Sequence, residues 1–83
     1  MTLKRYDVVD NLNCSIAHVT LWVEESVDDS PVYHVNSYFT DWYDDLYGQS
    51  HAVTYAYDWD FTDSIEALTR FEIEKRQMRI SYR

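Results

Sequence analysis

The stretch that decides the fold is SIAHVTLWVEE, residues 15–25, which alternates between apolar and more polar side chains along its length. Successive side chains of a β-strand point to opposite faces of a sheet, so such alternation predicts a strand. One face is apolar throughout, and we expect it to lie over the hydrophobic core. This apolar face consists of Ala17, Val19, Leu21 and Val23, and the opposite face of Ile16, His18, Thr20, Trp22 and Glu24.

Further strands are predicted on both sides of this stretch. Residues 2–10 alternate weakly and end in turn-forming residues. Residues 32–39 alternate again, and the segment SVDDSP, which joins them to residues 15–25, is typical of a hairpin loop. Residues 51–60, HAVTYAYDWD, place rings on one side and small or acidic residues on the other. The pattern leaves open which of these two sides a helix covers.

Two segments do not show the two-residue alternation of the predicted strands. Residues 41–47 fit either a short helix ended by Gly48, with Trp42 and Leu46 four positions apart, or a continuing strand. Residues 62–78 predict the main helix, with Thr62 or Asp63 as its N-cap. The tail, residues 78–83, fits the end of that helix or an edge strand. The apolar stripe predicted for the helix is Ile65, Leu68, Phe71 and Met78.

Together these elements predict an α+β fold in a single domain over residues 1–83. We expect an antiparallel sheet of three to four strands with one C-terminal helix packed on a face. A chain of 83 residues is near the lower limit at which one core suffices, so its large rings are an efficient way to bury apolar area. The predicted core includes Val19, Leu21, Val23, Val35, Phe39 and Leu68.

The distribution of charge is the most informative feature for function. The net charge is −8, yet residues 6–69 contain no lysine or arginine at all. A body with charge of one sign repels itself, and solubility does not require it. The acids in this body are Asp7, Asp10, Glu24, Glu25, Asp28, Asp29, Asp41, Asp44, Asp45, Asp58, Asp60, Asp63 and Glu66.

No constellation of residues predicts an enzyme, a metal site or a cofactor. Asp58, Asp60 and Asp63 lie close in sequence but lack the glycine and the later glutamate of a calcium loop. The three histidines, His18, His34 and His51, are expected to serve packing. Cys14 is the only cysteine, which precludes an internal disulfide and predicts a small buried side chain.

The same charge argues against direct binding of nucleic acid, because stacking proteins combine their rings with a positive groove. No apolar run approaches the length of a membrane span, and the start of the chain lacks a signal-peptide pattern, so we expect a cytoplasmic protein. What remains is protein binding, in which carboxylates orient a basic partner and tyrosine and tryptophan anchor it. The expected partner-binding residues are Glu24, Glu25, Asp28, Asp29, Asp41, Trp42, Tyr43, Asp44, Asp45, Tyr47, Asp58 and Asp60.

In size, acidity and aromatic content the chain resembles the DNA-mimic inhibitors of bacteriophages, which include small anti-CRISPR and anti-restriction proteins. The resemblance covers composition and rests on no motif, so it assigns no role to any residue. It implies an inhibitor, monomeric or homodimeric, that occupies the nucleic-acid-binding groove of a basic partner in the host cytoplasm. The alternative is an adaptor, immunity or antitoxin-like domain that binds a basic partner without imitating DNA.

Overall fold

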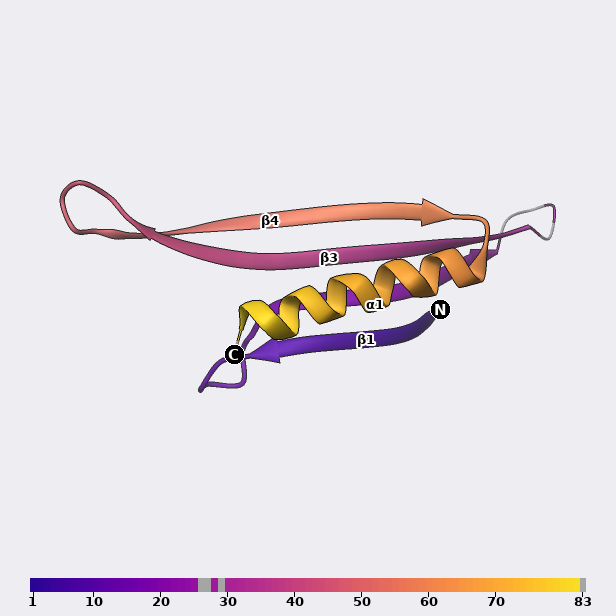
Figure 1. Cartoon of the computed structure of the whole chain (residues 1–83), viewed down its shortest axis with the longest axis horizontal. Coiled ribbons are helices and arrows are strands. Elements are labelled where there is room, and N and C mark those ends of the chain that lie inside the picture. Colours follow the sequence, from indigo (N-terminus) through magenta and orange to yellow (C-terminus); the bar gives the residue numbers. More distant parts are fainter. Residues whose placement is uncertain (26–27, 29, 83) are drawn as a thin grey trace.

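Four strands form one antiparallel sheet, and a C-terminal helix packs on one face of it (Figure 1). The computed structural model describes residues 1–25, 28 and 30–82. The strands follow one another across the sheet in chain order, so each neighbouring pair is a hairpin. The predicted α+β class is therefore confirmed. The elements are β1 (Thr2–Val9), β2 (Ser15–Glu25), β3 (Pro31–Asp44), β4 (Ser50–Phe61) and α1 (Ser64–Ser81).

The helix covers the apolar face of β2, as the alternation in that strand predicts. Ala17, Val19 and Leu21 are buried beneath it, together with Val35 of β3. Because Val35 pairs with Trp59 in the register of β3 and β4, the ring-bearing side of β4 belongs to the covered face. The small and acidic side of β4 lies on the opposite face, which we call the open face, and this settles the question left by the sequence.

The core differs from the predicted one in several residues and includes a different stripe of the helix. Val19, Leu21 and Val35 are buried as expected, while Val23 and Phe39 are half-buried. Placing Leu68 in the core was wrong, because 38% of it is exposed. The helix turns its neighbour Ala67 toward the sheet instead, and successive helical residues point about 100° apart. The buried helical residues are Ala67, Phe71 and Met78.

Both ends of α1 are tied by hydrogen bonds. Asp63 is the N-cap, and its carboxylate accepts a hydrogen bond of 2.8 Å from the backbone N–H of Ile65. At the other end the Tyr82 hydroxyl donates to the carbonyl oxygen of Thr40, at 2.9 Å. The helix continues to Ser81, so the alternative of an edge strand at the tail is wrong.

The segment 41–47 continues β3 as far as Asp44 and then turns, so the alternative of a short helix is wrong there. The Asp45 carboxylate accepts hydrogen bonds from the backbone N–H groups of Tyr47 and Gln49, at 2.8 and 2.9 Å. Gly48 adopts a positive φ of 77°, which closes the turn. Side-chain hydrogen bonds of this kind favour turns over helices, and they outweigh the weak helical spacing of Trp42 and Leu46.

The hairpin of β3 and β4 projects well beyond the C-terminal end of α1 (Figure 1). The molecule is elongated as a result, with principal extents of 55 × 21 × 20 Å. At the other turn, between β1 and β2, Cys14 is exposed, so the expectation that it would be buried was wrong. Among the described residues, the only helix is too polar to cross a membrane.

Candidate acidic binding surface

Three of the predicted partner-binding acids come together on the open face, and two of them contact one histidine. The ring nitrogens of His34 lie 2.6 Å from an Asp60 carboxylate oxygen and 3.1 Å from a Glu24 carboxylate oxygen. Strand pairing explains this arrangement, since His34 pairs directly with Asp60 in the neighbouring strand. We call Glu24, Asp58 and Asp60 the open-face acids.

Asp58 is held in the same way by a neighbouring amide. Its carboxylate accepts a hydrogen bond from the Asn36 side chain, and the Asn36 side-chain oxygen accepts one from the Trp22 indole N–H. The Trp22 ring in turn stacks on His34, with ring centroids 4.1 Å apart. These contacts link β2, β3 and β4 into one network, which limits the rotamers that the open-face acids can adopt.

The network leaves the carboxylates accessible. The side chains of Glu24 and Asp60 are 61% and 69% exposed, whereas the His34 side chain between them is only 17% exposed. No lysine or arginine among the described residues forms an ion pair with an open-face acid. The surface can therefore present oriented negative charge, and it loses little side-chain entropy when a partner binds.

A second set of predicted residues lies at the far end of the long hairpin, and we call Asp41, Asp44 and Asp45 the tip acids. The Asp44 carboxylate accepts a hydrogen bond of 2.7 Å from the Ser50 hydroxyl. Asp45 holds the turn and also lies 2.8 Å from a ring nitrogen of His51. The hydrogen bond with His51, followed by those from the backbone N–H groups, lowers the pKa of Asp45 below its usual range.

The rings predicted to anchor a partner are exposed at this tip. Trp42, Tyr43 and Tyr47 are 68%, 54% and 91% exposed, and Tyr43 stacks on His51. Leu46 beside them is fully exposed at the end of the turn. Sequence reasoning missed Leu46 as a surface residue because it assigned this residue to the apolar side of a short helix.

The two acidic sets do not form one continuous patch. Asp58 pairs with Asn36, which precedes Asp44 by eight positions along β3, a distance of about 26 Å in a strand. Charges are screened over about 8–10 Å at physiological salt. The structure thus brings Glu24 together with Asp58 and Asp60, and it places the tip acids too far away to act on the same phosphate-sized contact.

The remaining predicted acids belong to the loop between β2 and β3. Glu25 is exposed at the end of β2, and Asp28 is exposed in the turn that follows. Asp29 lies outside the described residues.

The three histidines do not converge. His18 and His34 lie on the open face, whereas His51 pairs with Tyr43 on the other side of the hairpin. Burial, followed by the nearby Arg5 charge, lowers the pKa of His18, which also stacks on Tyr38. Within residues 1–25, 28 and 30–82, no group of three or more histidine, cysteine or acidic side chains could hold a metal ion.

His34 and Asn36 are the functional candidates that sequence reasoning missed. Both lie at alternate positions of β3 and meet Asp60 and Asp58 across the sheet. The sequence signal that could have identified them is the turn at Asp45 and Gly48. That turn sets the register of the hairpin, and the register determines which residues of β3 and β4 lie opposite each other.

Comparison with known proteins adds no relative to this picture. No protein family, no curated protein and no solved structure matches the chain.

Proposed function

We propose that this protein binds a basic protein and occupies its nucleic-acid-binding groove, acting as an inhibitor by imitation of DNA. The observation that supports the proposal is that no lysine or arginine among the described residues pairs with the open-face or tip acids. The four ion pairs that lysine or arginine forms among the described residues join Lys4 and Lys75 to Glu72, Arg5 to Asp7, and Arg70 to Glu74. The negative charge of the open face and tip therefore remains available to a partner.

The spacing of the carboxylates supports the same proposal. Asp58 and Asp60 lie two positions apart on one face of β4, which corresponds to about 6.6 Å, comparable to the spacing of phosphates along one DNA strand. Glu24 adds a third charge two strands away. The network through His34 and Asn36 holds these charges in place, as the phosphates of a duplex are held by its backbone.

The exposed tip favours the alternative candidate, an adaptor or immunity-type domain that binds a basic protein without imitating DNA. Trp42 and Tyr47 offer large ring surfaces, which concentrate binding energy in protein interfaces and have no counterpart on a DNA backbone. The two candidates differ in whether bound DNA and this protein exclude each other.

The proposal is tested by competition. A guide-loaded CRISPR effector and a restriction endonuclease, each with a labelled target duplex, are titrated with this protein while fluorescence anisotropy reports bound DNA. We expect stoichiometric release of the duplex from one of these enzymes. Binding of the protein to an enzyme that keeps its duplex would support the adaptor candidate instead.

Two paired variants identify the surface responsible. Asp58→Asn with Asp60→Asn removes two open-face charges, and Asp41→Asn with Asp44→Asn removes two tip charges without touching the carboxylate that holds the turn. We expect the open-face pair to weaken binding about tenfold at low salt, and the loss to shrink as salt rises. Equal binding by both pairs and the parent would exclude these acids as the interface.

A further inference from the structure

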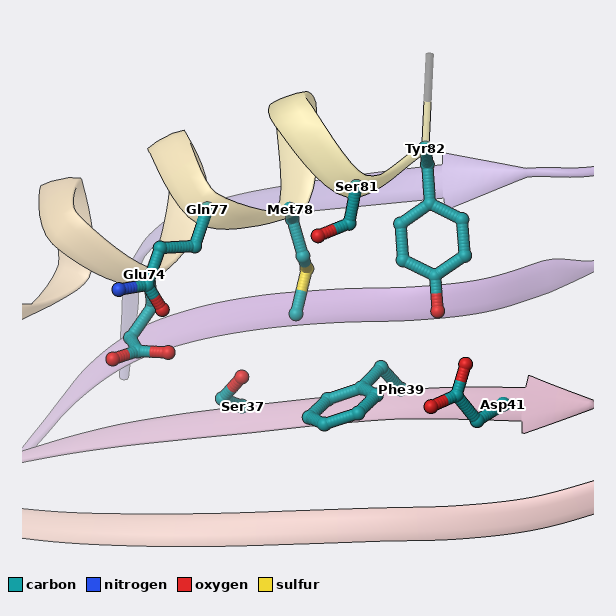
Figure 2. Close-up of a pocket in the computed structure, with 8 residues that line it drawn as sticks. All are labelled: Ser37, Phe39, Asp41, Glu74, Gln77, Met78, Ser81 and Tyr82. Atoms are coloured by element: carbon teal, nitrogen blue, oxygen red, sulfur yellow. The ribbon is translucent and has the colours of Figure 1, made fainter.

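A cavity of about 180 Å³ opens between the last turns of α1 and the covered face of β3 (Figure 2). Ser37, Phe39 and Asp41 line it from the strand, and Glu74, Met78 and Tyr82 are among the residues that line it from the helical side. Ligand pockets for drug-sized molecules are about 300–1,000 Å³, so this one has room for a group no larger than a side chain.

Ser37 is a polar residue at a core position of the sheet. It lies between Val35 and Phe39 on the covered face and is only 2% exposed. Its hydroxyl makes no side-chain hydrogen bond to any other described residue, and Figure 2 shows it directed toward the helix across the cavity. No described side-chain polar atom is both fully buried and without a partner, so the Ser37 hydroxyl is reached from the cavity and is free to bond to a group bound there.

Glu74 is a polar residue at a core position of the helix. It continues the buried stripe of Ala67, Phe71 and Met78, and its side chain is only 14% exposed. One carboxylate oxygen of Glu74 lies 3.3 Å from a guanidinium nitrogen of Arg70. Arg70 precedes Glu74 along the helix, whereas Met78 follows it. Ser37 and Glu74 are thus polar residues at positions where the pattern predicts apolar ones, and both line the same cavity. Residues that break the local pattern in this way cluster at functional sites.

Negative charge also lies at the end of the cavity formed by Asp41 (Figure 2). Asp41 forms no ion pair with any described residue, and no lysine or arginine lines the cavity. Burial, followed by the charge of Asp41, raises the pKa of the Tyr82 phenol, consistent with the closeness of the two side chains. The cavity therefore has a carboxylate at each end, Glu74 beside Ser37 and Asp41 beside Tyr82 (Figure 2).

We propose that this cavity binds an alkylammonium group. The ammonium is held by the Asp41 carboxylate at one end of the cavity, and its methylene stem packs on Phe39 and Met78. Where the ligand carries a second amino group, that group donates to the Glu74 carboxylate and the Ser37 hydroxyl at the other end. A lysine side chain of a protein partner and a free aliphatic diamine share this chemistry. Asp41 is also one of the tip acids, but the inference does not depend on the proposed inhibition, because its test uses a small ammonium ion and no protein partner.

The test is an NMR titration of the labelled protein with n-butylammonium chloride at constant ionic strength. We expect saturable shifts of the Ser37 and Asp41 amide signals and of the Met78 methyl signal. The neutral isostere 1-butanol should bind more weakly. Equal binding of the alcohol, or no saturable shift at these three residues, would overturn the proposal.

Two variants with the same change of charge complete the test. Asp41→Asn should weaken butylammonium binding by about threefold to tenfold, as expected for one charge-assisted contact near the surface. Glu66→Gln, in the first turn of α1 and outside the cavity, should bind like the parent. An Asp41→Asn variant that binds with unchanged affinity would overturn the assignment. Comparing N-acetyl-lysine methylamide with putrescine then distinguishes a lysine side chain from a free diamine as the natural occupant.

Discussion

The covered and open faces of the sheet use neighbouring residues of the same strands in different ways. On the covered face Val19 and Val35 are completely buried by α1. On the open face Trp22 and His34 have no covering element, and they are half-buried because they stack on each other. One face obtains stability from a second layer, whereas the other protects its rings by cross-strand contacts and keeps its carboxylates in solvent.

This difference shows that the open face is not a core face from which a covering layer is missing. Its apolar area is divided into stacked pairs, and its polar groups are joined in a network with the open-face acids. A sheet face that normally packs against a second helix would show a contiguous exposed apolar patch instead. Under the proposed function, stability and recognition belong to opposite sides of one sheet.

The largest effect is expected from a core truncation on the covered face. Leu21→Ala removes a side chain that is 4% exposed and should lower the free energy of unfolding by about 2–5 kcal/mol. Thr20→Ala, the next residue on the open face, should change it by less than about 1 kcal/mol. Urea unfolding of both variants measures the contrast. Similar losses from the two would show that the open face carries as much of the stability as the core.

A smaller effect of opposite sign, an increase in the free energy of unfolding, is expected when a polar residue of the helix that faces the covered side is made apolar. Glu74→Leu restores an apolar residue to the buried stripe and fills part of the cavity, so we expect a gain of about 0.5–2 kcal/mol. The ion pair with Arg70 is lost, but an isolated pair near the surface contributes little. Glu72→Leu, two positions away and off the stripe, serves as a control that loses ion pairs with Lys4 and Lys75 and should give no gain. A destabilised Glu74→Leu variant would mean that the glutamate serves the fold.

The elements themselves were predictable from local pattern. Alternation in residues 15–25 identified a strand and its buried side, and Asp63 with the apolar positions after it identified the helix. The segment 41–47 was harder, because the spacing of Trp42 and Leu46 fits one turn of helix while Asp45 and Gly48 fit a hairpin. Local propensity does not decide between them, but pairing of β3 with β4 does.

The candidate sites depend on contacts that local pattern does not contain. Asp60 meets His34 because of the register set by a turn between them, and Glu24 joins from a third strand. Ser37 and Glu74 are 37 positions apart and meet only after α1 packs on β3. The acids could be named from the sequence, but which of them act together could not, because grouping is a property of the packed sheet.

The smallest effect concerns the turn between β1 and β2 and the turn between β3 and β4, which share one construction. Asp10 accepts hydrogen bonds from the N–H groups of Leu12 and Cys14, as Asp45 does from the corresponding positions of its turn, and each turn has a positive φ three residues after the aspartate. Only Asp45 has a histidine partner, His51. The turns therefore form a matched pair that differs in one contact.

This contact predicts a difference in acid sensitivity. Because the pKa of Asp45 is lowered in the folded state, its ionised form stabilises the turn above the ordinary aspartate pKa of about 3.9, and this contribution is lost as pH falls through the lowered value. Amide hydrogen exchange at Gln49 should accordingly reveal a gap in protection between the parent and Asp45→Asn that is present at neutral pH and narrows below about pH 4. His51→Gln should remove most of this acid dependence while leaving the backbone contacts of Asp45 in place. A gap that persists unchanged down to pH 2.5 would show that the charge of Asp45 does not cause the difference in protection.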